Sequence, residues 1–257
     1  MIDLHAHVLP GIDDGPPDLE AAVALARAAA AEGVEAIVAT PHVSSGYQNT
    51  AATIATALRA LTAELAARSI AVRIHPGAEV ALTRALELSD GQLRGLRLGA
   101  GPWLLIEAPL APSVLPVETM LHSLAKRGHR VVLAHVERCP AFIEGGELLG
   151  RLVREGMLAS ITASALLGRF GRIPQQAAER FIAAGLIHNV SSDAHDCTSR
   201  PPGVLRLLAQ AGLAEQAPWL TQAVPEAILS GAGIPPAPSW PPAPAPRRRL
   251  PWSRRAA

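Results

Sequence analysis

The sequence has little of what several protein classes require. Its 257 residues include only two cysteines, Cys139 and Cys197, and 3% aromatic residues. Two cysteines are too few for a disulfide framework, so we expect a reduced, cytoplasmic protein. No charge-free apolar run approaches the roughly 20 residues that span a bilayer, and the N-terminal stretch MIDLHAHVLP lacks the basic and apolar regions of a signal peptide. A net charge of +1 argues against a nucleic-acid binder, whose basic excess would neutralise phosphates.

The motifs of several common catalytic machineries are also absent. We find no P-loop and no Rossmann glycine fingerprint after a strand. A Cys-x5-Arg phosphatase loop is missing, because Gly145 and Gly203 stand six residues after the two cysteines. No serine occupies a nucleophile elbow. Thiol and serine catalysis are therefore not expected.

Short apolar runs alternate along the chain with longer helical stretches rich in Ala and Leu. This alternation predicts parallel βαβ units, closed as a barrel or open as a doubly wound sheet. Five of the six predicted helices are followed by a glycine that can end a helix in the left-handed conformation: Gly33, Gly128, Gly156, Gly185 and Gly212. Strands are predicted at 2–5, 35–40, 71–75, 103–107, 130–135, 158–162 and 187–191, and helices at 19–32, 53–68, 116–127, 147–155, 175–184 and 203–211.

Two segments depart from this alternation. Residues 88–101 are glycine-rich and are predicted to form a loop or a small hairpin. The run PPAPSWPPAPAPRRRLPWSRRAA at the end of the chain is rich in Pro and then in Arg, which is typical of an extended, disordered segment. We therefore predict one domain over residues 1–234 and a disordered tail over residues 235–257.

Histidines and acids gather where predicted strands end. His5, His42, His135, Glu107 and Asp193 stand at or just past the carboxyl ends of apolar strands. In a parallel α/β fold these ends converge on one rim, where active sites form.

Two pairs have i, i+2 spacing, His5 with His7 and Asp193 with His195. Alternate side chains of a strand share a face, so each pair can address one centre. Glu79 can supply a bridging carboxylate, and Asp13 or Asp14 of the IDDG turn another oxygen. Imidazole and carboxylate ligands together suit Mn²⁺, Fe or Zn²⁺.

The remaining histidines lack this context. We interpret His75, His122 and His129 as structural, and His188 as a core residue or a partner of a ligand. Asp3 is either a partner that orients an imidazole or a satisfied carboxylate at the base of a barrel.

Eight ordered motifs resemble the PHP (polymerase and histidinol phosphatase) superfamily, and most closely its bacterial protein-tyrosine phosphatases of capsule and exopolysaccharide synthesis. The resemblance runs from Met1 to about Ile234. Its motifs are IDLHAH, LPGIDDG, ATPH, GAEV, LLIEAP, LAHVER, ITASALLGRFG and SSDAHDCTSRPPG.

The resemblance implies a distorted (β/α)7 barrel, similar to a TIM barrel, with two or three metal ions, most often Mn²⁺. By motif, His5, His7, Glu79 and Asp193 would hold one ion, Glu79, Glu107 and His135 a second, and Asp14, His42 and His195 a third. Arg138 and Arg200 would grip the phosphate, for which the planar fork of arginine is suited.

Three positions depart from the family pattern. Val43 stands where members often carry a second histidine, so an outer ligand or a proton donor is missing there. Cys139 replaces a frequent aromatic residue, and Cys197 follows the SDAHD stretch. We interpret both cysteines as buried and inert, with oxidation sensitivity at the rim as the alternative.

The predicted function is hydrolysis of a phosphomonoester, most closely protein phosphotyrosine, by metal-activated water without a phosphoenzyme. Segment Gly46-Tyr47 and the loop LLGRFG are candidates for the mouth of the site, with loop packing as the simpler explanation. The alternatives are a small-molecule phosphatase of the histidinol-phosphate type, a nuclease, and a regulatory docking protein with weak activity.

The resemblance also implies a partner, the tyrosine-rich tail of an autophosphorylating bacterial kinase at the inner membrane. The RRRLPWSRR segment offers peripheral attachment to anionic lipid or to an acidic kinase tail.

Overall fold

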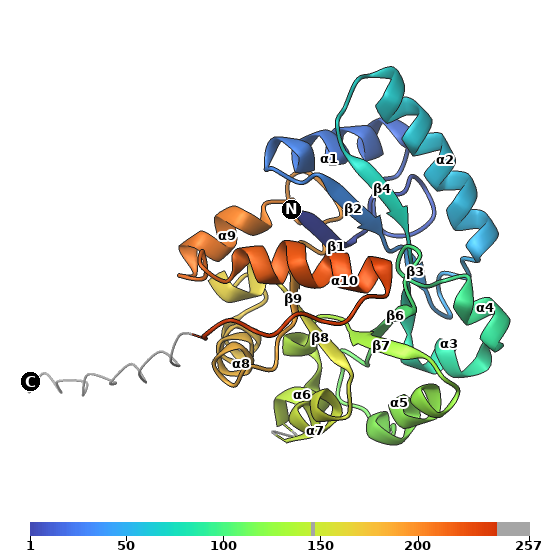
Figure 1. The fold of residues 1–257 in the computed structure, drawn as a ribbon. Coiled ribbons are helices and arrows are strands. Elements are labelled where there is room, and N and C mark those ends of the chain that lie inside the picture. The colour runs from blue at the N-terminus through green and yellow to red at the C-terminus, as the bar shows by residue number, and fades with distance from the viewer. Residues whose placement is uncertain (145–146, 241–257) are drawn as a thin grey trace, which may run out of the picture.

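The computed structural model describes residues 1–144 and 147–240, in which short strands alternate with helices as predicted (Figure 1). The strands are β1 (Ile2–Ala6), β2 (Ala36–Ala39), β3 (His42–Val43), β4 (Arg73–Pro76), β5 (Glu79–Ala81), β6 (Trp103–Glu107), β7 (Arg130–Leu133), β8 (Leu158–Thr162) and β9 (Asn189–Ser191).

The helices lie around the strands, and none in the described ranges is long and apolar enough to cross a membrane. They are α1 (Leu19–Ala31), α2 (Ala51–Ala67), α3 (Leu82–Glu87), α4 (Asp90–Arg94), α5 (Val117–Lys126), α6 (Pro140–Glu144), α7 (Leu148–Arg154), α8 (Arg172–Ala183), α9 (Val204–Gln210) and α10 (Val224–Ser230), with helical turns η1 (Val136–Arg138), η2 (Ala163–Leu167) and η3 (Trp219–Ala223).

The strands form a parallel ring. The predicted strands 35–40 and 71–75 correspond to β2 and β4, and each continues after a short break in a strand that was not predicted, β3 and β5. Both parts pair in register, Ala39 with Pro76 and His42 with Glu79. From β5 the pairing continues through β6, β7 and β8 to β9. A parallel bridge between Ala6 and Ala194 joins the end of the ring to β1, which pairs with β2. The predicted distorted (β/α)7 barrel is confirmed.

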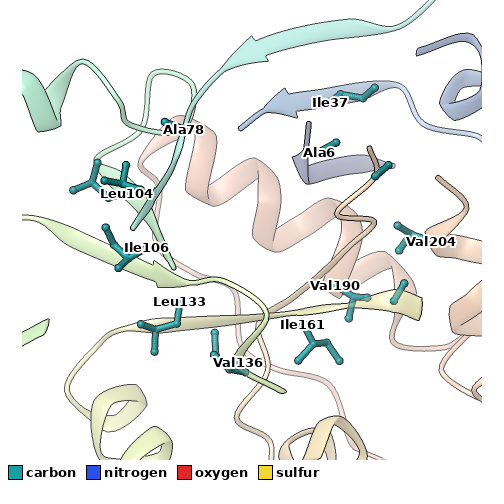
Figure 2. Packing of buried hydrophobic residues seen from close by; sticks show 14 of the residues in the cluster. Ala6, Ile37, Ala78, Leu104, Ile106, Leu133, Val136, Ile161, Val190 and Val204 are labelled. Atoms are coloured by element: carbon teal, nitrogen blue, oxygen red, sulfur yellow. The ribbon is translucent and has the colours of Figure 1, made fainter. Parts of the chain in front are cut away.

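Alternate strand residues divide the core into two clusters, because successive side chains of a strand point to opposite faces. Ile2, Leu105 and Val132 face the inner cluster, where Val224 and Ile228 of α10 cover the amino end of the ring. The opposite faces pack against the surrounding helices, and Figure 2 shows part of this outer cluster, including Ile37, Leu104, Leu133 and Ile161. Both layers leave the carboxyl rim free for polar side chains.

The segment 88–101 is not the loop or hairpin that we predicted. It contains the helix α4, which Ser89 and Gln92 begin with a reciprocal capping box. The S-x-x-Q spacing carries this signal, but the surrounding glycines obscured it. Helix α10 was also missed, whereas the five glycines predicted to end helices all have positive φ.

The described start of the predicted tail, residues 235–240, is extended but contacts the domain. Trp219 Nε1 donates to Pro235 O at 3.2 Å, and Gln216 Nε2 donates to Ser239 O at 3.0 Å. Trp240 packs edge-on against Trp219, with ring centroids 5.6 Å apart. The chain therefore follows the domain surface beyond residue 234, while the rest of the predicted tail lies outside the described residues.

Gly101 permits the close approach of α10 to the start of β6. A Cβ atom there would lie 1.8 Å from the backbone oxygen of Ile228. We expect Gly101→Ala to lower the free energy of unfolding by about 2–3 kcal/mol, because backbone has to shift. Gly233→Ala is the control, since a Cβ there meets nothing within 4 Å. Urea denaturation checks this, and equal stability of the two variants would contradict the tight approach.

His188 predicts an acid-dependent loss of stability. Burial lowers its pKa to about 4, and its Nδ1 accepts the Ala159 N–H at 3.3 Å. Because the pKa is below the unfolded value of about 6.5, the contribution is present above pH 6.5 and is lost as the pH falls toward 4. We expect His188→Gln to reduce the loss of stability between pH 7 and pH 5 by about 2 kcal/mol.

The matched control is His122→Gln, because His122 is exposed and paired with Glu155 on the surface. Urea denaturation at both pH values measures the change. An unaltered pH dependence in the His188 variant would show that the imidazole titrates normally in the folded protein.

Candidate metal centre

The predicted ligands converge at the carboxyl rim of the ring. Each lies at or shortly after the end of a strand, which is where the barrel gathers its loops. Except for Asp14, Glu107 and His42, they are at least 95% buried. The ligands are His5, His7 and Asp14 after or within β1, His42 in β3, Glu79 in β5, Glu107 in β6, His135 after β7, and Asp193 and His195 after β9.

An irregularity in β1 aims its histidines at this centre. Ile2 and Leu4 face the inner cluster, so strict alternation would turn His5 outward. The register with β2 shifts between Asp3 and Ala6, and such a bulge changes which side chains face inward. His5 and His7 consequently point toward Glu79 and Asp193.

Two ligands have a backbone that L-residues adopt rarely. His135 has φ of 29° and Asp193 has φ of 53°, both in the left-handed region. Such conformations cost roughly 1–3 kcal/mol and are concentrated at functional sites. They turn each side chain into the centre directly after its strand ends.

The inner part of the centre joins two imidazoles to two carboxylates. His5 Nε2 and His7 Nε2 are 3.2 Å apart. Each lies 3.4–3.6 Å from Glu79 Oε2 and from Asp193 Oδ1. Ligand atoms that share one ion at about 2.1 Å are about 3–3.5 Å apart, so these separations fit a common ion.

The other groups share residues with this one. Glu79 Oε1 lies 2.6 Å from His135 Nε2, and Glu79 Oε2 lies 3.0 Å from His42 Nδ1. The ligand atoms fall into four overlapping groups: His5, His7 and Asp193; His5, Glu79 and His135; His42, Glu79 and Glu107; and His7, Asp14, His42 and His195. His7 therefore joins Asp14, His42 and His195, the ligands predicted for the third ion. The ligands predicted for the second ion are divided, because Glu79 shares one group with His135 and another with Glu107.

Neighbouring acceptors fix the ring orientations. His7 Nδ1 contacts Asp13 Oδ2 at 2.7 Å, and His195 Nδ1 contacts the backbone oxygen of Asp193 at 3.0 Å. Each contact favours the proton on Nδ1, so that the lone pair of Nε2 is the one that can bind an ion. In this structure the lone pair of His195 Nε2 faces Arg200 Nη1 at 2.7 Å. Asp13, one of the two alternatives in the IDDG turn, therefore orients a ligand, whereas Asp14 Oδ1 faces His42 and His195 at 3.5 and 3.4 Å.

The pKa directions show imidazoles and carboxylates that stabilise each other's charged forms. Burial opposes protonation of His7, but Asp13 and Glu79 raise its pKa to about 10. Burial also opposes protonation of His135, but Glu79 raises its pKa to about 9. Burial favours the neutral form of Glu79, yet His5 and His135 hold its pKa well below the usual range. A bound cation would take the place of these protons.

The surroundings of Glu79 provide a test of whether this donor set fits a metal. Its buried Oε2 lies 3.0–3.5 Å from nitrogens of His42, His5 and His7, but accepts no hydrogen bond of good geometry among the described residues. A buried carboxylate oxygen in such surroundings is costly unless a cation compensates its charge. Together with the mixed imidazole and carboxylate chemistry, this shows that the residues fit divalent transition metals.

Both predicted phosphate-binding arginines reach this centre. Arg138 Nη1 donates to Asp193 Oδ2 at 3.1 Å, and Arg200 Nη2 donates to the same oxygen. Arg200 Nη1 also lies 2.7 Å from His195 Nε2. The two guanidinium groups therefore border the ligands, as the interpretation as phosphate-binding residues requires.

Glu137 is a buried acid that the sequence interpretation missed. Its Oε1 accepts the Thr162 N–H at 3.0 Å, and burial raises its pKa to about 7. The HVER motif contains it, but nothing in the sequence distinguishes an inward carboxylate from an exposed one. Its contact ties the loop after β7 to the end of β8.

Two of the histidines interpreted as structural make contacts away from the centre. His129 contacts Asp90 at 3.0 Å, and His122 pairs with Glu155. Asp3, for which two interpretations were open, accepts the backbone N–H groups of Ser192 and His5 and not an imidazole N–H. Cys139 is buried as predicted, but Cys197 is exposed, so the interpretation of Cys197 as buried was wrong.

Substitutions at Asp13 and Glu79 separate orientation from ligation. We expect Asp13→Asn to weaken Mn²⁺ binding about 10–100-fold, since an oriented imidazole binds better. Glu79→Gln is expected to weaken it more, because Glu79 contacts several groups. Calorimetric titration with Mn²⁺ measures both, and exposed Glu87→Gln is the control. Equal affinity of all three variants would contradict a metal centre at this rim.

Comparison with known proteins agrees with this geometry. A family model described as capsular polysaccharide synthesis, CpsB/CapC, matches residues 1–212. The tyrosine-protein phosphatase YwqE of Bacillus subtilis (strain 168) is 35% identical over 201 residues, covering 78% of this chain and 79% of that protein. The putative tyrosine-protein phosphatase CapC of Staphylococcus aureus is 31% identical over 204 residues, covering 78% of this chain and 79% of that protein.

The fold of this chain also matches solved structures. One comes from a study of YwqE from Bacillus subtilis and CpsB from Streptococcus pneumoniae, described as unique metal-dependent tyrosine phosphatases. It matches with a TM-score of 0.81 and 33% identity, covering 93% of this chain and 99% of that chain. A β-aspartyl dipeptidase from Fervidobacterium islandicum, with a TM-score of 0.57, 16% identity and coverage of 89% of this chain and 72% of that chain, shares the fold alone.

These matches confirm the resemblance to bacterial tyrosine phosphatases of capsule synthesis that the sequence motifs indicated. The chain belongs to the CpsB/CapC family of capsular polysaccharide synthesis.

Proposed function

We propose that this chain is a metal-dependent phosphatase that removes phosphate from tyrosine residues of a protein. The observation that carries the proposal is the convergence of nine imidazole and carboxylate ligands with Arg138 and Arg200 at one rim. Family membership supports it, because relatives from Bacillus subtilis and Streptococcus agalactiae are named tyrosine-protein phosphatases.

The nine ligands would hold two or three ions, and we propose Mn²⁺, with Fe or Zn²⁺ as alternatives. Bound there, the ions would act as Lewis acids toward the phosphoryl oxygens and the attacking water. Contacts with Asp13 and with the backbone oxygen of Asp193 leave the lone pairs of His7 Nε2 and His195 Nε2 as those that can bind the ions.

The two arginines supply directed positive charge beside the ligands. Each guanidinium group has five N–H donors, and contacts with Asp193 and His195 use only some of them. The remaining donors can bind two phosphoryl oxygens at once, which stabilises charge that develops during the reaction.

The departure from the family pattern at position 43 lies outside the centre. Val43 is buried in the outer apolar cluster, whereas its neighbour His42 belongs to the ligand groups. The side chain of Val43 therefore packs the barrel and does not select between an aryl phosphate and an alkyl phosphate.

The surface around the centre supports a protein substrate. Among the described residues, the exposed large apolar side chains all lie on segments that follow β3, β6 and β8, either in a loop or in the helical turn η2 and the helix α8 after β8. Exposed apolar groups that gather at a mouth mark a surface for another macromolecule. They are Tyr47, Leu110, Val114, Leu115, Leu167 and Ile173.

The pocket that contains Asp193 and Arg200 of the metal centre has a volume of about 140 Å³. This is smaller than the roughly 300–1,000 Å³ of common small-molecule sites.

Tyr47 stacks on His42 with ring centroids 5.7 Å apart, so the predicted segment Gly46-Tyr47 does border the centre.

We further propose that the substrate is the phosphorylated tail of a capsule-synthesis tyrosine kinase, and that the enzyme works in the cytoplasm. Capsular polysaccharide synthesis in the family description supports the kinase, and two free cysteines support a reducing compartment. Attachment to the membrane through the Arg-rich tail remains a proposal. Every predicted ligand occupies the centre, which does not favour an inactive docking protein.

Phosphate release from a phosphotyrosine peptide tests the proposal. We expect turnover that requires Mn²⁺, stops with EDTA and is unaffected by iodoacetamide. Arg200→Lys is expected to lower kcat about 100-fold, since lysine cannot reproduce the bidentate contact. The control is Arg151→Lys, whose side chain pairs with Glu118 on the surface.

Histidinol phosphate is the comparison substrate in the same assay. Faster hydrolysis of histidinol phosphate than of the peptide would replace the tyrosine assignment with the small-molecule alternative. A folded, metal-loaded protein that hydrolyses neither would favour the docking alternative.

A further inference from the structure

A pocket adjoins the metal centre between the loops that follow β8 and β9. It contains Asp193 and Arg200, which belong to the centre, and extends to side chains that have no place in it. Phe170 forms part of its wall and lies under the guanidinium group of Arg138, with Cζ 4.5 Å from the ring centroid. Two further arginines, Arg169 and Arg206, also line this pocket.

Arg169 and Arg206 are exposed and only weakly engaged. Arg169 Nη1 donates to the backbone oxygen of Ser199 at 3.4 Å, and no carboxylate of the described residues lies within ion-pair distance of it. Arg206 Nε lies 3.6 Å from Glu32 Oε1, a long contact between half-exposed side chains. Both arginines therefore keep N–H donors for an incoming anion.

The lining of the pocket is positive. It contains three arginines, Arg169, Arg200 and Arg206, and one acid, Asp193. Asp193 is already bound by Arg138 and Arg200, and Asp196 beside the pocket accepts the N–H groups of Thr198 and Ser199 within its own loop. Glu32 is the one acid within ion-pair distance of Arg206 among the described residues. The positive lining contrasts with the net charge of only +1 of the whole chain.

We propose that Arg169 and Arg206 form a subsite for an acidic side chain that flanks the phosphotyrosine of the substrate. The inference rests on the proposed phosphatase function and adds a preference for acidic peptides. With the phosphate at the centre and the aromatic ring beside Phe170, the flanking residues of the peptide meet the two arginines. Exposed pairs of arginine and carboxylate contribute modestly, so the preference should be several-fold rather than absolute.

The experiment uses the full chain with Mn²⁺ and three peptides that carry the same phosphotyrosine. The residues on both sides of it are Glu, Ala or Lys. The wild-type protein is expected to show a kcat/KM about fivefold higher for the Glu peptide than for the Ala peptide, with the Lys peptide lowest. The preference should fall with added salt, because exposed charges are screened.

The double variant Arg169→Ala, Arg206→Ala is expected to bring the Glu to Ala ratio close to one. The ratio is taken within each protein, so a change in total activity does not affect it. Arg172→Ala is the matched control, since Arg172 is exposed at the start of α8 but does not line the pocket, and should keep the wild-type ratio.

The outcomes separate the two proposals. Hydrolysis of all three peptides at equal rates would overturn the acidic subsite and leave the phosphatase function intact. A preference that survives in the double variant would overturn its assignment to these arginines. Failure to hydrolyse any peptide would instead overturn the phosphatase function. A fourth peptide, with a second phosphotyrosine in place of Glu, tests which anion the subsite binds. If this peptide is preferred over the Ala peptide and the Glu peptide is not, the subsite binds phosphate and not carboxylate, which would overturn the proposed preference for acidic side chains.

Discussion

The whole site depends on the closure of the strand ring between its first and last strands. Asp193 N–H donates to His5 O at 2.9 Å, and His7 N–H donates to Ala194 O at 2.8 Å. Asp3 reinforces the seam by accepting the Ser192 N–H. Because these bonds join the two ends of the domain, the His-x-His and Asp-x-His pairs meet at one point. Without this closure, Asp193 and His195 would lie at the opposite edge of an open sheet from His5 and His7.

The centre is energetically unfavourable by itself, and the rest of the barrel has to support it. Carboxylates and imidazoles are buried together, which costs desolvation that pairing repays only in part. His135 and Asp193 add strained backbone conformations. Two apolar clusters, one inside the ring under α10 and one between the strands and the helices, stabilise the fold that holds these groups together. A bound cation would remove much of the remaining cost, so metal binding and folding should be coupled.

The mouth of the barrel divides chemical tasks between its loops. Segments after β3, β6 and β8 present apolar side chains such as Tyr47, Val114 and, in the first turn of α8, Ile173. Arg169, Arg200 and Arg206 line the pocket between the segments after β8 and β9. An apolar surface next to a cationic pocket suits a peptide whose phosphorylated residue must reach the metal centre. The barrel provides the common frame, and these loops, which are free to vary without disturbing the core, determine the substrate.

The sequence by itself determined the alternation of strands and helices and the histidines and acids at the strand ends, because helix ends, strand periodicity and residue chemistry are local. The two arginines beside them were identified through the resemblance of motifs. Only the tertiary structure decided which way these residues point. The shift in β1 turns His5 inward, and the ring separates the adjacent acids Asp13 and Asp14 into an orienting partner and a member of the metal-ligand groups. It also buries Glu137 and holds residues 235–240 against the domain. These outcomes depend on contacts between segments far apart in the chain, and local sequence patterns do not encode such contacts.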